Sequence, residues 1–363
     1  MRQDLGMRLL MEVMNWSDAE TADELKAIDR LARYKYDEYS DFLAGAHFVE
    51  NLAKWLQQFD ESDRQCAYDF IRNRLVFISA AEVSRLVETF FPGTIYYHIL
   101  REIGSREDTS EFEILRADGG QRLVSEAIRK TLFVGLSDGA RLDVFRRSNV
   151  GRIKNDQVLL TSEVDDARWR AAHDELQKDI GGALFERIYL IDDFAASGTT
   201  LCRYQDEKWK GKLPRFFGSV QEYFGNVIAE GAPIHVHHFI GTSEAEARMQ
   251  EREHAIRASG EPWFTGPIKF SFGLVLRREV ILDEDADSDF LALCDAYYDS
   301  SIESIHGDAA GERCLKRGYA RCQLPVIMHH NTPNNSVALL WAESEGGSGT
   351  KMTPLFRRRQ RHS

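Results

Sequence analysis

Residues 187–201, with the sequence RIYLIDDFAASGTTL, decide the fold that we predict for this chain. An apolar run over 188–191 carries β-branched and aromatic residues and ends at two aspartates, which is typical of a buried strand in a parallel sheet. Small residues follow directly over 195–200. Their backbone N–H groups can close around an anion, and we expect a helix that begins near Thr200 to point its positive end at the same place.

Asp192 and Asp193 stand at the carboxyl end of this strand. Two adjacent acids there need partners, because an unpaired buried charge is costly. Carboxylates cannot hold a phosphate, but they accept hydrogen bonds from sugar hydroxyls or hold a magnesium ion. Strand, acids and loop together therefore predict a pocket for a ribose 5-phosphate. The alternative is an ordinary strand–loop–helix turn of an α/β fold in which the two acids occur by chance.

The same order of features resembles the signature loop of the type I phosphoribosyltransferases. The resemblance implies an α/β fold with a parallel sheet flanked by helices, a site for phosphoribosyl pyrophosphate, and Mg²⁺ as cofactor. It gives the ribose hydroxyls to Asp192 and Asp193, which would also contact the metal ion indirectly. It gives the 5-phosphate to the small-residue loop, namely Ala196, Ser197, Gly198, Thr199 and Thr200.

A second strand–loop–helix unit, TLFVGLSDGARLDVFRR, occupies residues 131–147. The apolar run 132–136 predicts a buried strand, and a tight loop follows with Ser137, Asp138, Gly139 and Ala140. The resemblance implies that the amides of this loop bind the leaving pyrophosphate. Asp138 departs from that pattern, because an acid beside a pyrophosphate is repulsive unless magnesium intervenes. The alternative is a plain strand-to-helix turn with Asp138 as the N-cap.

The polar segment 148–182 contains Arg152 and Lys154 beside a glycine. In the family a mobile loop at this position closes over the reaction and brings cations to the pyrophosphate. The resemblance therefore makes Arg152 and Lys154 candidates for that role, with solvated loop charges as the alternative.

The stretch LPVIMHHNTPNNSVALLW, residues 324–341, places two apolar runs around a cluster of turn residues. Many such clusters are only turns. The alternative is that three amides recognise the acceptor, and these are Asn331, Asn334 and Asn335. The stretch 324–341, together with the loop after the acid pair, resembles the phosphoribosyltransferase-like proteins of bacterial conflict systems. That resemblance implies a role as an anti-phage defence effector.

Residues 1–93 carry apolar side chains at helical spacing and predict an N-terminal helical domain. Its helix order is similar to a winged-helix layout, but the last helix carries Glu82, Arg85 and Glu88 and so lacks a basic recognition face. A helical cap, or a domain that docks a protein partner from a defence system, is the better-supported interpretation.

We expect the α/β domain over 94–342, beginning with a strand over 94–100. Residues 343–363 predict a flexible basic tail with Arg357, Arg358, Arg359 and Arg361. Such a tail can contact nucleic acid or an acidic partner, although a solvated tail is the default.

The whole chain has a formal charge of −12 and 43% hydrophobic residues. An acidic chain is poorly suited to coating nucleic acid. No apolar run is long enough to span a bilayer, and Asp4 and Glu12 stand where a signal peptide would be apolar. Five scattered cysteines without a CxxC motif suggest neither a disulfide framework nor a zinc ribbon. We therefore expect a cytoplasmic protein, with homo-oligomerisation left open.

Three functions fit these features. The first is displacement at the anomeric carbon of a ribose 5-phosphate. In the purine-salvage branch of the resembled family an acid stands where this chain has Ala196, so base protonation must come from elsewhere or the acceptor is not a purine. The second is a non-catalytic nucleotide-sensing regulator or interaction protein, which Asp138 and the helical domain favour. The third is a hydrolase that cleaves the glycosidic bond of nucleotides with water as acceptor.

Overall fold

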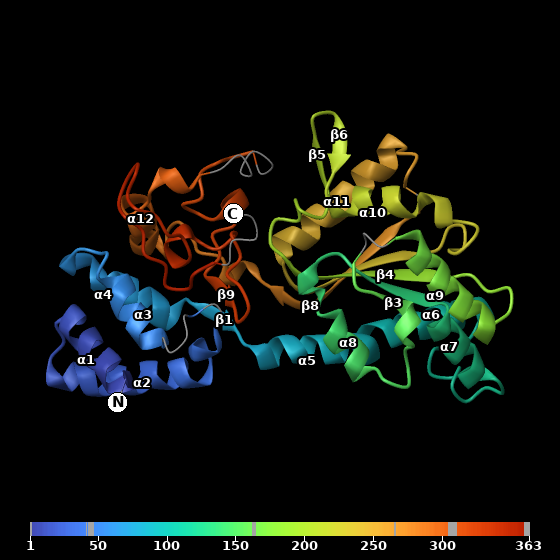
Figure 1. Ribbon diagram of the computed structural model, residues 1–363, viewed down its shortest axis with the longest axis horizontal. Helices are drawn as coiled ribbons and strands as arrows, with labels where there is room; N and C mark the ends of the chain where they lie inside the picture. Colours follow the sequence, from blue (N-terminus) through green and yellow to red (C-terminus); the bar gives the residue numbers. More distant parts are fainter. Residues whose placement is uncertain are drawn as a thin grey trace. The chain divides into compact units, whose positions relative to one another are not determined.

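A computed structural model of the chain describes residues 2–40, 42, 47–161, 165–264, 266–303 and 311–358. The chain divides into two compact units (Figure 1). The first consists of Met1–Glu82 and Arg277–Ser363, and the second of Val83–Leu276. Within the described residues no helix is long and apolar enough to cross a membrane.

The second unit is built on a five-stranded sheet in which every neighbouring pair is parallel. In spatial order the strands are β3 (Val158–Leu159), β2 (Thr131–Gly135), β4 (Arg187–Ala195), β7 (Ile234–Thr242) and β8 (Ile268–Leu276). The predicted parallel α/β fold is confirmed, and both strands that we expected to carry site loops lie side by side. Because the strands are parallel, their carboxyl ends meet at one edge of the sheet.

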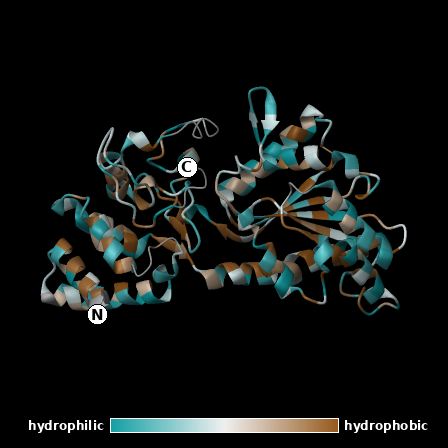
Figure 2. Ribbon diagram, in the orientation of Figure 1, coloured by the Kyte–Doolittle hydropathy of each residue, from teal (hydrophilic) through white to brown (hydrophobic). Residues whose placement is uncertain are grey.

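Helices flank both faces of this sheet, and they are α5 (Ala80–Phe90), α6 (Tyr96–Glu107), α7 (Gly120–Arg129), α8 (Leu142–Ser148), α9 (Asp166–Asp179), α10 (Lys212–Val220) and α11 (Ser243–Ser259). Successive side chains of β4 point to opposite faces of the sheet, and helices pack against both faces. Ile188 and Leu190 share one hydrophobic cluster with residues of α9, α10 and α11. Tyr189 points the other way, to rings on α5 and α6. Figure 2 shows hydrophobic residues concentrated in the strands between these layers.

The prediction of a strand over 94–100 was wrong. A π-helical turn over Phe91–Ile95 continues α5 directly into α6. Ile95, Ile99 and Ile103 are all buried and are spaced by four residues, as on one face of a helix. The change of chain character near residue 93 is therefore no break between the units, which divide at residues 82–83.

The first unit combines the N-terminal helices with the C-terminal segment. Its helices are α1 (Arg2–Met14), α2 (Asp18–Tyr34), α3 (Phe48–Leu56), α4 (Glu61–Asn73) and α12 (Ser288–Ala296). Strand β1 (Val76–Ile78) pairs in parallel with β9 (Val326–Met328). The rings of Phe70 in α4 and Phe290 in α12 stack at 3.5 Å. Residues 277–342, which we expected in the α/β domain, thus pack with the N-terminal helices, and no antiparallel wing is seen in the part of this unit that the structure describes.

The described part of the expected flexible tail is packed into the first unit. Leu355 and Phe356 are buried among its aromatic side chains. Arg357 forms an ion pair with Glu343 at 2.5 Å, and the guanidinium of Arg358 lies 5.4 Å from the ring centre of Trp341. Arg359 and Arg361 lie outside the described residues.

Candidate functional site

The loops after β2 and β4 meet because these two strands are neighbours. Gly135 pairs with Ile191, so the residues that follow them emerge together at the carboxyl edge. The hydroxyl of Ser137 donates a hydrogen bond to Oδ1 of Asp192 at 2.5 Å. The predicted pyrophosphate loop and the predicted ribose acids are therefore in direct contact.

Gly139 leaves room for the carboxylate of Asp193 beside the first loop. A Cβ at this position would lie 2.2 Å from Oδ2 of Asp193, closer than any side-chain carbon can stand. The turn Asp138–Ala140 is a short 3₁₀ segment, and Asp138 is exposed. Helix α8 begins later, after Arg141 in the left-handed conformation, so Asp138 is not its N-cap.

Asp192 is 2% exposed, and both of its carboxylate oxygens have partners. Oδ1 also accepts the backbone N–H of Asp193 at 3.1 Å, and Oδ2 is bound by the ammonium of Lys212. Burial raises the pKa of Asp192 above its ordinary value, and the Lys212 ammonium opposes that shift. Nε2 of His238 lies 3.9 Å from Oδ2. Burial lowers the pKa of His238 to about 3, so this ring is neutral at pH 7 and Lys212 is the cation that compensates Asp192.

Hydrogen bonds stabilise the small-residue loop after β4. Ser197 and Thr199 are buried, and their hydroxyls lie 2.7 Å apart. The hydroxyl of Thr242, the N-cap of α11, donates to the carbonyl of Ala196 at 2.7 Å. Gly198 adopts a left-handed conformation with φ of +68°, and Thr200 is exposed.

No helix follows this loop directly, so that part of the prediction was wrong. A hairpin of β5 (Arg203–Gln205) and β6 (Lys208–Lys210) comes first, and α10 begins only at Lys212. Gly211 returns the chain to the loop with a φ of +125°, where a Cβ would lie 2.5 Å from the carbonyl oxygen of Leu201. The backbone N–H of Lys212 then donates to the carbonyl of Thr200 at 3.0 Å. This return places the Lys212 side chain at Asp192.

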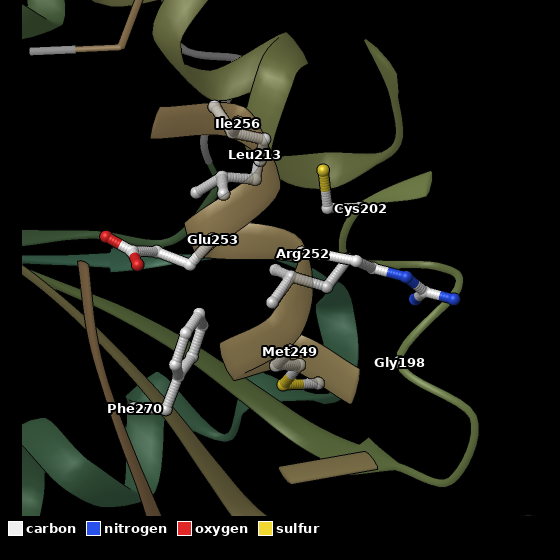
Figure 3. A pocket seen from close by; sticks show the side chains of 9 residues that line it. Gly198, Cys202, Leu213, Met249, Arg252, Glu253, Ile256 and Phe270 are labelled. Carbon is white, nitrogen blue, oxygen red and sulfur yellow. The ribbon is translucent and has the colours of Figure 1, made fainter. Parts of the chain in front are cut away.

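Two arginines that the sequence analysis did not single out lie beside the loop. Nη1 of Arg203 donates to the carbonyl of Thr199 at 3.4 Å. Nη1 of Arg252, on α11, lies 3.4 Å from the position that a Cβ of Gly198 would take, and within the described residues this buried nitrogen has no hydrogen-bond partner. Figure 3 shows Arg252 extending from α11 toward the segment with Gly198, beside a cavity of about 10 Å³, room for roughly one water molecule. Burial lowers the pKa of Arg252 below its usual value.

The two flexible-loop candidates have different surroundings. Lys154 pairs with Asp179 at 2.7 Å, and Asp179 also binds Arg129. These contacts are typical of a structural ion-pair network. Arg152 is exposed in the turn that precedes β3.

The three asparagines belong to the first unit, whereas the acid pair and its loops belong to the second. Nδ2 of Asn335 donates to the carbonyl of Tyr319 at 3.1 Å, and the carbonyl of Asn334 accepts the N–H of Tyr319 at 2.7 Å. Asn331 closes a turn with Met328. These contacts fix a turn in the first unit, and acceptor recognition by these amides stays a prediction.

The acid pair was also expected to contact Mg²⁺ indirectly. Among the described residues no group of three or more His, Cys, Asp or Glu side chains could hold a metal ion. Ser137 and Lys212 already occupy the two oxygens of Asp192. In this arrangement Asp192 does not fit as a magnesium ligand, while the carboxylate of Asp193 is partly exposed.

Sheet topology and the two joined loops define a phosphoribosyltransferase-like protein. A family model named PRTase-CE matches residues 52–358. The chain belongs to this family, and the match includes parts of both compact units. No curated protein and no solved structure matches the chain.

Proposed function

We propose that the protein binds a ribose 5-phosphate ligand, either phosphoribosyl pyrophosphate or a nucleotide, and acts at its anomeric carbon. The observation that carries this proposal is the junction of the two loops. Ser137 contacts Asp192, and Gly139 leaves room for Asp193, at the carboxyl ends of adjacent parallel strands. Ligands of open α/β sheets bind at this edge.

The roles follow from the positions of the groups. Asp193 is partly exposed and accepts hydrogen bonds from the ribose hydroxyls, while residues 196–200 receive the 5-phosphate. Residues 137–140 receive the pyrophosphate. In the transfer reaction the bond from the anomeric carbon to pyrophosphate oxygen breaks, and the acceptor atom forms the new bond. In hydrolysis the base leaves and water supplies the oxygen.

The first experiment is calorimetric titration of the full-length protein with phosphoribosyl pyrophosphate, nucleoside 5′-monophosphates and ribose 5-phosphate, each with and without Mg²⁺. We expect at least one of these ligands to bind, and Asp193→Asn to weaken that binding about tenfold or more. Asp206→Asn is the matched control, since Asp206 is exposed on the β5–β6 hairpin. Failure of all three ligands to bind would reject the proposal.

A nucleotide-sensing regulator is the second candidate, and the ion pair between Lys212 and Asp192 favours it, because one ribose acid is already engaged inside the protein. Incubation of the bound ligand with candidate bases, followed by chromatography, separates the two functions. Released pyrophosphate or free base supports an enzyme, and an unchanged nucleotide supports a sensor.

The proposal also includes a role in bacterial anti-phage defence, with a protein partner bound through the N-terminal helices. Phage plating on a bacterial host that expresses the wild type or Asp193→Asn tests this role. Protection by the wild type and its loss in the variant are expected. Equal plating on both strains would remove the defence role and leave ligand binding to be judged by calorimetry.

A further inference from the structure

The ammonium of Lys212 forms an ion pair with Oδ2 of Asp192. The Lys212 side chain is 17% exposed and the Asp192 side chain 3%, so this ion pair is largely shielded from water. The other oxygen of Asp192 accepts from Ser137 and from the backbone of Asp193. Each carboxylate oxygen of Asp192 therefore has a partner within the protein.

Charge compensation explains why a cation is needed at this position. Asp192 and Asp193 are adjacent, and a ligand with a 5-phosphate would add further negative charge nearby. One ammonium group lowers the charge of the acid pair and so lowers this repulsion. A divalent ion can do the same, but it needs oxygen ligands with open coordination positions, which Asp192 does not offer while Lys212 is bound.

Backbone hydrogen bonds hold the segment that carries Lys212. The N–H of Lys212 is bonded to the carbonyl of Thr200, and the N–H of Leu213 to the carbonyl of Leu201. The segment that carries the cation is thereby joined to the small-residue loop. Ligand binding in the loop and the position of Lys212 are linked through these two bonds.

We propose that Lys212 is a positioning residue of the ribose site. Its ammonium compensates Asp192 in place of a divalent metal ion, and the partly exposed carboxylate of Asp193 accepts the ribose hydroxyls. The statement about the ligand rests on the proposed function, whereas the statement about the ion pair does not.

The first test needs no ligand. Thermal unfolding is measured with and without millimolar MgCl₂ for the full-length wild type, Lys212→Met, and the double variant Asp192→Asn/Lys212→Met. Lys210→Met is the control, because Lys210 pairs with Asp206 on the exposed hairpin. We expect Lys212→Met to lower the Tm, Mg²⁺ to recover part of the loss, and the double variant to regain stability without a Mg²⁺ response beyond that of the control. A wild-type Tm and no Mg²⁺ response in Lys212→Met would overturn the role of Lys212.

The second test measures binding of ribose 5-phosphate and a nucleoside 5′-monophosphate, two ligands without a pyrophosphate that would itself hold magnesium. The wild type and Lys212→Arg are expected to change affinity less than about threefold when Mg²⁺ is removed, and Lys212→Met to lose about tenfold or more. Magnesium-dependent binding by the wild type would overturn the inference and keep the proposed function. No binding by the wild type, together with the expected thermal results, would reject the ribose-phosphate ligand and keep Lys212 as the cation of Asp192.

Discussion

Replacing His235 by phenylalanine is expected to make the second unit less sensitive to acid. His235 lies in β7, is 4% exposed, and stacks on Tyr189 at 4.6 Å and on His98 at 5.1 Å between ring centres. Burial lowers its pKa to about 3, and the charges of His98, Lys269 and Arg187 act in the same direction. Phenylalanine retains an aromatic ring for the stacking and cannot be protonated. Within the described residues Nδ1 of His235 has no hydrogen-bond partner, so the substitution removes no bond from that atom.

The magnitude follows from the difference between the folded and unfolded pKa values. In the unfolded chain histidine titrates near pH 6.5, whereas folded His235 stays neutral down to about pH 3. Its contribution to stability is therefore complete above pH 6.5 and decreases as the pH falls toward 3. Linkage gives a loss of about 0.8 kcal/mol at pH 6 and about 2 kcal/mol at pH 5 from this one residue. His235→Phe should remove that loss.

Urea unfolding at about pH 7.5, 6 and 5 measures this difference. A brief deuterium pulse at one fixed pH, read in peptides of β7, follows the second unit separately, because a protein with two compact units need not unfold in one step. His254→Gln is the control, since His254 is an exposed histidine on α11. Equal losses of the free energy of unfolding between pH 7.5 and 5 in the wild type and His235→Phe would contradict a neutral, buried His235.

Three further substitutions test the site and the two cores. Gly139→Ala should weaken ribose 5-phosphate binding about tenfold or more in calorimetry, since its Cβ would displace the carboxylate of Asp193; unchanged affinity would exclude this carboxylate from the ribose site. Glu102→Ala should lower the free energy of unfolding of the second unit by about 3 kcal/mol in urea, because it leaves Arg187, which is 2% exposed, without its carboxylate partner. Phe356→Ala should destabilise the first unit by about 3 to 4 kcal/mol in the same assay, and a loss under about 1 kcal/mol would contradict the packing of this ring.

Short sequence patterns were enough to predict the parallel sheet and the edge at which the candidate site lies. Apolar runs of strand length predicted β2 and β4, and the acids and small residues at the end of β4 indicated the candidate site, which stays a prediction. A threonine is also a common N-cap residue, and the hydroxyl of Thr242, which precedes α11, accepts the N–H of Ala245 at 3.0 Å. Each of these signals depends on neighbours within a few residues.

Residues 94–100 show where local propensity misleads. Ile95, Tyr96, Tyr97 and Ile99 are residue types that favour strands, and Pro92 stands just before them. The π-helical turn over Phe91–Ile95 accommodates the proline and lets the helix continue. The spacing of the buried isoleucines was the signal that could have corrected the prediction.

The remaining features depend on contacts between residues that lie far apart in the sequence. No local sequence pattern predicts such contacts. Strand β1 pairs with β9, whose first residue, Val326, lies opposite Val76. Lys212 reaches Asp192 only because Gly211 turns the chain back after the hairpin. In the sequence the same lysine lies among basic and aromatic residues over 208–217, and such composition does not indicate a contact with Asp192.

The hairpin after the small-residue loop changes how a phosphate can be held. A helix that starts at such a loop normally offers the unbonded N–H groups of its first turn. In α10 the N–H groups of Lys212 and Leu213 are already bonded to loop carbonyls, and Pro214 has no N–H. The first turn of α10 therefore has no N–H at these three positions for an anion.

Positive charge for the loop must then come from side chains and from the amides of the loop itself. Arg203 is bonded to the loop carbonyl of Thr199, and Arg252 places a buried nitrogen beside Gly198. These arginines come from the inserted hairpin and from α11, two elements outside the signature stretch. A charged hydrogen bond from a guanidinium to phosphate is stronger than one from a neutral amide, so two such groups can replace the contribution of a helix terminus. In the proposed function the affinity of the loop for a phosphate thus depends on the folded unit, and the small residues of the signature supply mainly the space.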